Sequence, residues 1–172
     1  MSLLDSAVAI LANQGMNYLS TGSAPGRIGN FHPNLSPYQV FECSDGHIII
    51  ATGNDQQYQK LCSILKCPEQ ALDPKYQTNA KRVENRDELD AILNHKTKKW
   101  KKVKLLEKCE ANGIPAGPIN SLDEVFADQQ IIHRGMELSL EGIPSVRSPI
   151  RFSESELVLN KPSPKLGEHN SI

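Results

Sequence analysis

A short hairpin pattern constrains the fold of this chain more than any other feature. Residues 38–52 read YQVFECSDGHIIIAT, in which apolar residues flank an Asp-Gly pair. Such a pair between apolar runs is the strongest short-range signal for a tight turn that joins two antiparallel strands. The second run holds Ile48, Ile49 and Ile50 in succession. Because strand side chains alternate between faces, this run predicts burial on both faces and a central strand.

The remainder of the chain adds helices to this hairpin. Its 172 residues are 38% hydrophobic and 23% charged, which suits one globular domain with a modest core. Apolar residues recur at helical spacing over residues 2–19, after Asp55, after Asn85 and over residues 98–111. We therefore predict an α+β fold, with a small antiparallel sheet, helices packed on one side and a leading helix. Weak strands are expected over residues 136–152.

Local signals predict where several of these helices begin. Asn54 or Asp55 is a natural N-cap for the helix that follows the hairpin. Asn85 and Glu88 have the spacing of a capping box, and Ser121 precedes another short helix. Each signal also places a turn directly ahead of its helix.

The charge pattern argues against nucleic-acid and membrane partners. The formal net charge of −1 provides no overall field to attract polyanions. The run KTKKWKKVK at residues 96–104 is locally basic, but on a helix over residues 98–111 we expect Trp100 and Val103 to point inward. We interpret the run as a solvated helix face. No stretch approaches the ~20 apolar residues that a membrane span needs.

The sequence contains no complete motif for a metal site or for a catalytic nucleophile. Cys62 and Cys67 lack a second cysteine pair, and no histidines have the i, i+4 spacing of a metal-binding helix. Cys62 and Cys109 lie on apolar helix faces, where buried, inert thiols are expected. A Ser-His-Asp triad remains an open alternative, because its members can be distant in sequence and meet only in the folded structure. We expect no metal site, and a reducing, cytoplasmic location because nothing marks the chain as secreted.

Two loops are the remaining candidates for a site. Residues 23–37, SAPGRIGNFHPNLSP, form a long segment without apolar periodicity, and such loops are uncommon in compact domains unless they are functional or flexible. The second candidate is Gly53-Asn54-Asp55, which follows the second strand. On residues alone, ordinary turn chemistry and a binding site are both open interpretations.

Seven segments occur here in an order that resembles the C-terminal part of the class III CoA-transferases, also called the CaiB/BaiF or formyl-CoA transferase family. They are SLLDSAVAILANQGMNYLSTG, GNFHPNLSPYQVFECSDGHIIIATGNDQQYQKLC, NAKRVENRDEL, NGIPAGPIN, RGM, SPIRF and LGEH. The resemblance covers nearly the whole chain.

The resemblance implies that catalysis and substrate enclosure are divided between two domains. In that family a large domain holds a Rossmann-like core, most of the CoA site and a catalytic aspartate upstream of the matched region. We therefore expect a linker helix at 1–22 that packs on the large domain, a small α+β domain at 23–160, and a tail at 161–172 that returns toward the large domain. The aspartate is expected outside this sequence, so we assign no catalytic residue here and expect the isolated chain to be inactive.

The resemblance also implies a mechanism and a set of substrate-binding residues. The family's aspartate forms an acyl anhydride with a CoA thioester, and a mobile loop of the small domain closes over it. Coenzyme A thioesters and carboxylates are thus the expected substrates, without a covalently bound cofactor. The loop maps to residues 29–36, which lack the glycine run of formyl-CoA transferases and so disfavour oxalate or formate. The expected substrate-binding residues are Gly29, Asn30, Phe31, His32, Pro37, Tyr38, Gly53 and Asn54.

Three alternatives remain. Related 2-methylacyl-CoA racemases place an acid/base glutamate where this chain has Asn54, and a carboxamide cannot take a proton from carbon. The chain could instead be a non-catalytic acyl-CoA-binding module or a partner subunit of a two-chain enzyme. Family members form interlocked dimers, so a homodimer is expected, and a dicarboxylate such as succinate is the expected acid.

Overall fold

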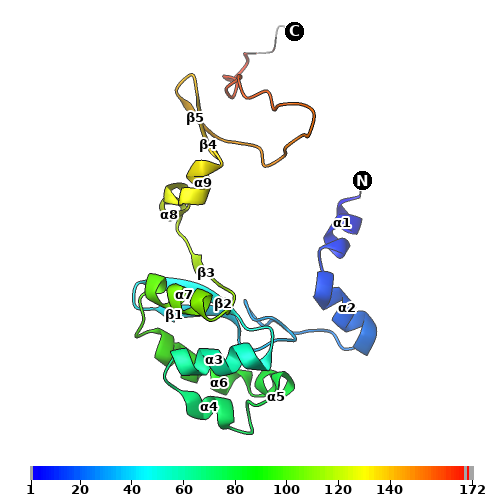
Figure 1. Ribbon diagram of the computed structural model, residues 1–172. Helices are drawn as coiled ribbons and strands as arrows, with labels where there is room; N and C mark the ends of the chain where they lie inside the picture. Colours follow the sequence, from blue (N-terminus) through cyan, green and yellow to red (C-terminus); the bar gives the residue numbers. More distant parts are fainter. Residues whose placement is uncertain (1, 169, 171–172) are drawn as a thin grey trace. The chain divides into compact units, whose positions relative to one another are not determined.

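The computed structural model describes residues 2–168 and residue 170 (Figure 1). The chain divides into two compact units, Met1–Ile119 and Asn120–Ile172, and each is described by itself. The expected division at 1–22, 23–160 and 161–172 stays a prediction, and the tail of that division includes residues 169, 171 and 172, which lie outside the described residues.

The first unit contains a three-stranded antiparallel sheet. Strands β1 (Tyr38–Cys43) and β2 (Gly46–Ala51) form the predicted hairpin, and β3 (Ala116–Ile119) pairs with the other edge of β2. The strand order β1-β2-β3 places β2 in the centre, as predicted. Because Pro118 has no N–H to donate, its strand is suited to an edge of the sheet.

One face of this sheet carries the core. Gln39, Phe41 and Cys43 of β1 and Ile48 and Ile50 of β2 are buried, whereas the intervening residues are only partly buried or exposed. Alternation of this kind is typical of an antiparallel sheet that is covered on one side. The prediction that β2 is buried on both faces therefore holds only in part, since its middle isoleucine is half-buried.

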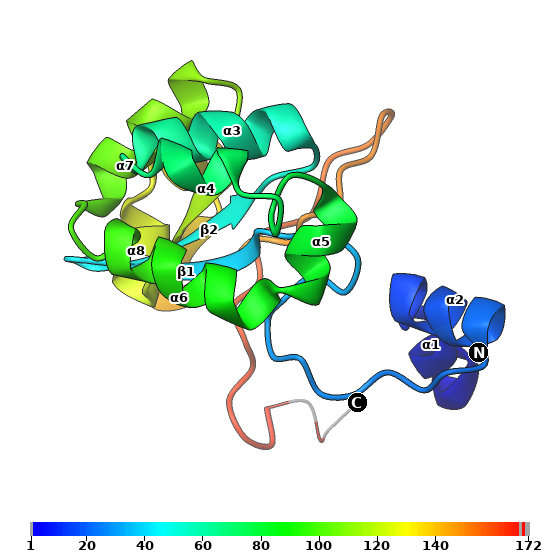
Figure 2. The ribbon, with the colours of Figure 1, turned by 90° about the horizontal axis from the view of Figure 1, so that it is seen from below.

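Helices cover the buried face. Helices α3 (Asp55–Ile64), α6 (Arg86–Thr97) and α7 (Lys102–Ala111) contribute the buried residues Tyr58, Leu61, Cys62, Leu89, Leu93, Leu105 and Cys109. Figure 1 shows α3 and α6 on the same side of the sheet, and Figure 2 views the unit from that side. Two short helices, α4 (Pro68–Leu72) and α5 (Asn79–Glu84), connect α3 to α6. The predicted small antiparallel sheet with packed helices is confirmed.

The leading segment forms two helices, so the expectation of one helix over residues 2–19 is wrong. Helix α1 (Leu3–Ala9) ends before α2 (Ala12–Thr21) begins, and Ala12 has a φ of +45°. This left-handed backbone conformation cannot continue a right-handed helix, so the chain breaks there. Ser2 caps α1 by accepting from the Asp5 N–H at 3.3 Å.

Two further details differ from the sequence prediction. Asn85 stands at the N-cap of α6, but its carboxamide donates to the carbonyls of Lys75 and Lys81 instead of capping. Helix α7 begins only at Lys102, and Val103 is 60% exposed. The later start places residues 105 and 109 on the buried face, one turn apart.

The second unit is smaller. It contains α8 (Leu122–Ala127), α9 (Gln129–His133) and a hairpin of β4 (Glu137–Leu140) and β5 (Ile143–Val146). The predicted cap at Ser121 is present, since its N–H donates to the Glu124 carboxylate at 2.9 Å. The turn at Glu141-Gly142 has φ values of +53° and +80°, as a two-residue hairpin turn requires.

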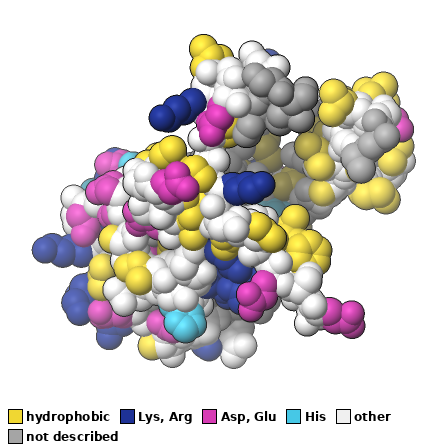
Figure 3. All heavy atoms as spheres, turned by 90° about the horizontal axis from the view of Figure 1, so that it is seen from above, with side chains coloured by type: hydrophobic (Ala, Val, Ile, Leu, Met, Phe, Trp, Pro, Cys, Tyr) yellow, Lys and Arg dark blue, Asp and Glu magenta, His cyan; other side chains and the backbone are white. Residues whose placement is uncertain are grey.

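The surface mixes charges of both signs. Figure 3 shows Lys and Arg side chains interspersed with Asp and Glu side chains over the visible face. Such interspersion provides no extended field of one sign. Among the described residues, no helix combines the length and apolar character that crossing a bilayer requires.

Candidate functional site

The two candidate loops meet at one edge of the sheet. Tyr38, the first residue of β1, lies opposite Ala51, the last residue of β2. Directly beyond that pair, the Pro37 carbonyl accepts hydrogen bonds from the N–H and the hydroxyl of Thr52, at 3.0 and 2.8 Å. The fold thus brings Pro37 and Tyr38 next to the turn that begins at Gly53.

A buried arginine fixes the segments on both sides of this junction. The Arg82 guanidinium is 1% exposed, and its Nε donates to the Ser36 carbonyl at 2.7 Å. Its Nη1 donates to the Tyr76 carbonyl at 2.9 Å, and its Nη2 to the Asp55 carboxylate at 2.7 Å. The guanidinium carbon also lies 4.4 Å from the centre of the Tyr58 ring. One side chain therefore links the segment before β1 to the start of α3.

The turn at Gly53-Asn54 is built around a helix cap. The Asn54 carboxamide oxygen accepts from the Gln57 N–H at 2.9 Å, which confirms Asn54 as the N-cap of α3. The Gln57 side chain accepts in return from the Gly53 N–H at 2.7 Å and donates to the Gly113 carbonyl at 3.0 Å. The Gly53 N–H and the Asn54 carboxamide oxygen thus have partners in the turn and the first turn of α3, and substrate contact by Gly53 and Asn54 stays a prediction.

The loop of residues 28–34, here called the 28–34 loop, runs along the free edge of β1. The Asn30 side chain accepts from the Val40 N–H at 2.8 Å, and the His32 N–H donates to the Tyr38 carbonyl at 2.9 Å. The His32 ring stacks on the Tyr38 ring with 4.9 Å between centroids. Three of the predicted substrate-binding residues therefore contact one another or the β1 edge, and their own polar groups hold the loop there.

A second arginine fastens the 28–34 loop to α6. Arg86 donates from Nη2 to the carbonyls of His32 and Pro33, at 2.8 and 3.2 Å, and its guanidinium lies 5.3 Å from the Phe31 ring centre. Its Nε is buried without a hydrogen-bond partner. Burial lowers the pKa of the Arg86 guanidinium, an effect that the neighbouring Asp87 carboxylate opposes.

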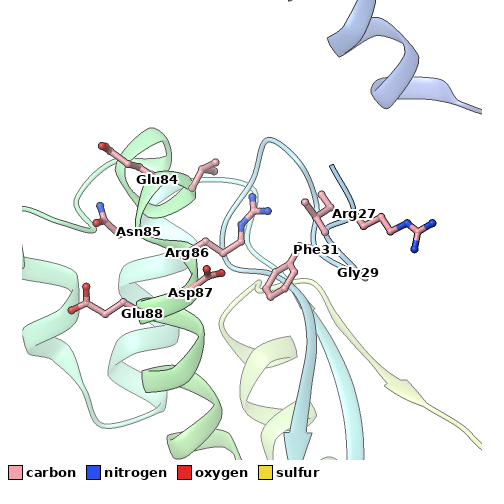
Figure 4. A pocket seen from close by; sticks show the side chains of 10 residues that line it. Arg27, Gly29, Phe31, Glu84, Asn85, Arg86, Asp87 and Glu88 are labelled. Atoms are coloured by element: carbon pink, nitrogen blue, oxygen red, sulfur yellow. The ribbon is translucent and has the colours of Figure 1, made fainter. Parts of the chain in front are cut away.

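A cavity of about 680 Å³ lies between this loop and the junction of α5 and α6. In Figure 4 the Arg86 side chain extends from α6 and the Phe31 side chain from the 28–34 loop. Its lining residues are Arg27, Ile28, Gly29, Phe31 and Val83 to Glu88. Of the predicted substrate-binding residues, only Gly29 and Phe31 line this cavity; Asn30, His32, Pro37, Tyr38, Gly53 and Asn54 do not. The cavity has the size of a small-molecule site.

The pKa values of the buried cysteines shift in opposite directions. A hydrogen bond with Cys62, helped by the charge of Lys96, lowers the pKa of the Cys67 thiol. All four are buried free thiols. Burial, and to a lesser degree Cys43, raises the pKa of Cys109 to about 11, so this thiol stays protonated at neutral pH. Within the described part of the chain, no three His, Cys, Asp or Glu side chains are grouped so that they could hold a metal ion.

Sequence reasoning missed Arg82 and Arg86, the two side chains that organise this region. Both lie in NAKRVENRDEL and in or beside the short helix α5. Arginines four residues apart on an otherwise polar segment are normally read as solvated. Only the fold reveals that both are turned toward the loop before β1.

Comparison with known proteins places these features in a family. A family model described as CoA-transferase family III matches residues 1–170. A curated relative from Agrobacterium fabrum, "Succinate--glutarate CoA-transferase", is 49% identical over 99% of this chain and 44% of the relative. The mouse "Succinyl-CoA:glutarate CoA-transferase" is 40% identical over 98% of this chain and 40% of the relative. The chain spans less than half the length of these relatives.

A solved structure agrees with the sequence comparison. The crystal structure of a CAIB/BAIF family protein from Brucella suis superimposes with a TM-score of 0.85 at 49% identity. The match covers 99% of this chain and 45% of that protein.

Proposed function

The chain belongs to CoA-transferase family III, and on that premise we propose that it takes part in moving coenzyme A between dicarboxylic acids such as succinate and glutarate. The observation that carries this proposal is the 49% identity, across nearly all of the chain, to a relative named for these two acids. Coenzyme A thioesters and free carboxylates are then its substrates.

The proposed chemistry is covalent and uses a nucleophile outside this chain. An aspartate carboxylate attacks the thioester carbon, an anhydride bond forms, and the C–S bond breaks to release the CoA thiolate. The relatives are more than twice as long as the matched region, so they have room for this aspartate elsewhere. Asp55 is an unsuitable nucleophile because its carboxylate is paired with Arg82 at 2.7 Å.

The role proposed for this chain is to protect the acyl intermediate. An anhydride hydrolyses in water, so a loop that excludes water while the acyl group is bound preserves it. The 28–34 loop suits that role because separate contacts attach it, and it is not a strand of the sheet: the Asn30 side chain accepts from the Val40 N–H, the His32 N–H donates to the Tyr38 carbonyl, and Arg86 donates to the His32 carbonyl. The cavity beside Phe31 and Arg86 leaves space under it.

A racemase function is less well supported. It would need a proton acceptor at position 54, and the carboxamide present there caps α3. An acyl-CoA-binding module or a partner subunit is compatible with the same contacts, but no specific observation favours either. Four free thiols fit the proposed cytoplasmic location.

A chimeric enzyme tests the proposal. The region of the Agrobacterium fabrum relative that matches this chain is replaced by residues 1–172, and CoA transfer from succinyl-CoA is measured by mass spectrometry against glutarate, oxalate and formate. We expect glutaryl-CoA as the main product. A folded chimera that makes none, or that prefers oxalate or formate, would contradict the proposed substrates.

A further inference from the structure

A second cavity, of about 480 Å³, lies where α3 and α6 end. It is lined by Leu65, Lys66, Lys96, Lys99 and Trp100, and we call it the lysine–tryptophan cavity. Three of the five lining residues are cationic and none is acidic. The basic run at residues 96–104 is therefore not a uniform solvated helix face, because part of it turns toward one hollow.

Two other lysines of the basic run have acidic partners. Lys98 pairs with Glu42 at 2.9 Å, and Lys104 pairs with Glu107 at 2.9 Å. Within the cavity, Lys96 donates only to the Lys66 carbonyl, at a long 3.4 Å. The side chains of Lys66 and Lys99 make no hydrogen bond or ion pair to the part of the chain that the structure describes. Three ammonium groups that have no acidic partner among the described residues thus lie at one cavity.

Helix dipoles account for only part of this positive charge. Each helix C-terminus carries roughly half a negative charge, so the ends of α3 and α6 together offset about one of the three ammonium groups. About two positive charges remain without a counter-charge. Like charges held close together repel, and a bound anion with more than one charge would relieve that repulsion.

The tryptophan supplies a flat, fixed surface beside these charges. The Trp100 carbonyl accepts hydrogen bonds from the N–H and the hydroxyl of Ser44, at 2.9 and 3.0 Å, so its backbone is fastened to the β1–β2 turn. Its indole is half-buried, with part of its surface open to the cavity. A ring in this position can stack on a planar ligand group.

We propose that the lysine–tryptophan cavity binds a phosphate-bearing nucleotide. The ammonium groups of Lys66, Lys96 and Lys99 contact the phosphate oxygens, and the indole of Trp100 stacks on the base. The nucleotide portion of coenzyme A and a free nucleotide share this chemistry. The inference stands on the cavity alone and does not depend on the proposed CoA transfer.

The single tryptophan of the chain makes the test direct. Fluorescence of Trp100 is followed while the full chain is titrated with ADP, coenzyme A, pyrophosphate or adenosine. We expect saturable changes with ADP and coenzyme A, at least about fivefold weaker binding of pyrophosphate because it cannot stack, and weaker binding in high salt. Saturation by coenzyme A with no response to ADP would overturn the proposal.

Matched lysine variants identify the site. Lys96→Ala and Lys99→Ala should each weaken ADP binding about threefold to tenfold, because each removes a charged donor. Lys104→Ala removes an exposed lysine of the same run that is paired with Glu107 and should bind like the parent chain. Far-UV circular dichroism checks that each variant is folded. No saturable response to about 10 mM ADP, or equal affinity in all three variants, would overturn the proposal.

Discussion

The Arg82 guanidinium combines full burial with an ion pair, two hydrogen bonds to carbonyls and a ring contact. A charge removed from water is tolerated only when such partners replace the lost hydration. Its bonds to Ser36 and Asp55 span 46 and 27 positions of sequence. Arg82 is thus a tertiary anchor for the segment before β1, and its contribution can be measured.

We expect Arg82→Met to lower the free energy of unfolding by about 3–5 kcal/mol, because it leaves the Ser36 and Tyr76 carbonyls buried without donors. Urea unfolding followed by circular dichroism measures the change. Lys75→Met is the matched control, since the Lys75–Glu88 pair is exposed on both sides and should contribute little to the free energy of unfolding. Equal losses in the two variants would contradict the role assigned to Arg82.

Because of the buried Cys109 thiol, we expect the free energy of unfolding to fall at alkaline pH. Burial raises its pKa to about 11 in the folded chain, above the ordinary value of 9.0. Below about pH 9 both states are protonated; above it the unfolded state loses the proton first, so stability falls as pH rises toward about 11. The loss approaches about 3 kcal/mol. Cys109→Ala should flatten this pH dependence in urea unfolding, and an unchanged slope would contradict the assignment.

At the scale of elements, short-range signals predicted the fold well and long-range contacts were missed. The β1–β2 hairpin and the Asn54 and Ser121 caps depend on residues within a few positions of one another. Arg86 instead binds carbonyls 53 and 54 positions away, and no local pattern encodes such a pairing. The same limit explains why only two of the predicted substrate-binding residues line the cavity beside it.

The break between α1 and α2 has a related explanation. Propensity favours one continuous helix through Ala12, yet that residue has a left-handed backbone in the structure. The late start of α7 at Lys102 likewise follows tertiary contacts, because the Asp45 carboxylate accepts from the Lys102 N–H at 2.8 Å. The side chain that caps α7 comes from the β1–β2 turn, far away in sequence.

The contribution of the α3 N-cap to the free energy of unfolding can be tested by substitution of Asn54. We expect Asn54→Ala to cost about 1 kcal/mol of unfolding free energy, because the Gln57 N–H loses its acceptor. Asn54→Asp keeps an acceptor oxygen and adds a favourable charge at the helix start, so it should be neutral or stabilising. Thermal unfolding of both variants tests this, and equal destabilisation by the two would exclude a capping role.

At the scale of the whole molecule, α1 and α2 carry large apolar side chains that no other described residue covers. Those more than half exposed are Leu3, Leu4, Val8, Ile10, Leu11, Met16 and Leu19. Exposed apolar surface of this kind marks an interaction site. We propose that it packs on another copy of the chain when no large domain is present.

Self-association should therefore depend on this surface. We expect the sedimentation mass to rise with protein concentration, and Leu4→Glu with Ile10→Glu to restore the monomer, because charges disfavour apolar contact. Leu72→Glu changes an equally exposed leucine on α4 and should leave the association unchanged. A parent chain that stays monomeric at every concentration would contradict the proposal.

CoA transfer by the purified chain alone tests the central claim most directly. The chain is incubated with succinyl-CoA and glutarate, and glutaryl-CoA is measured by mass spectrometry, with the intact Agrobacterium fabrum relative as the positive control. We expect no product from the chain at any protein concentration, because we propose that the nucleophile lies outside these residues. Turnover by the chain would place a nucleophile within it and contradict the proposal that the catalytic aspartate lies elsewhere.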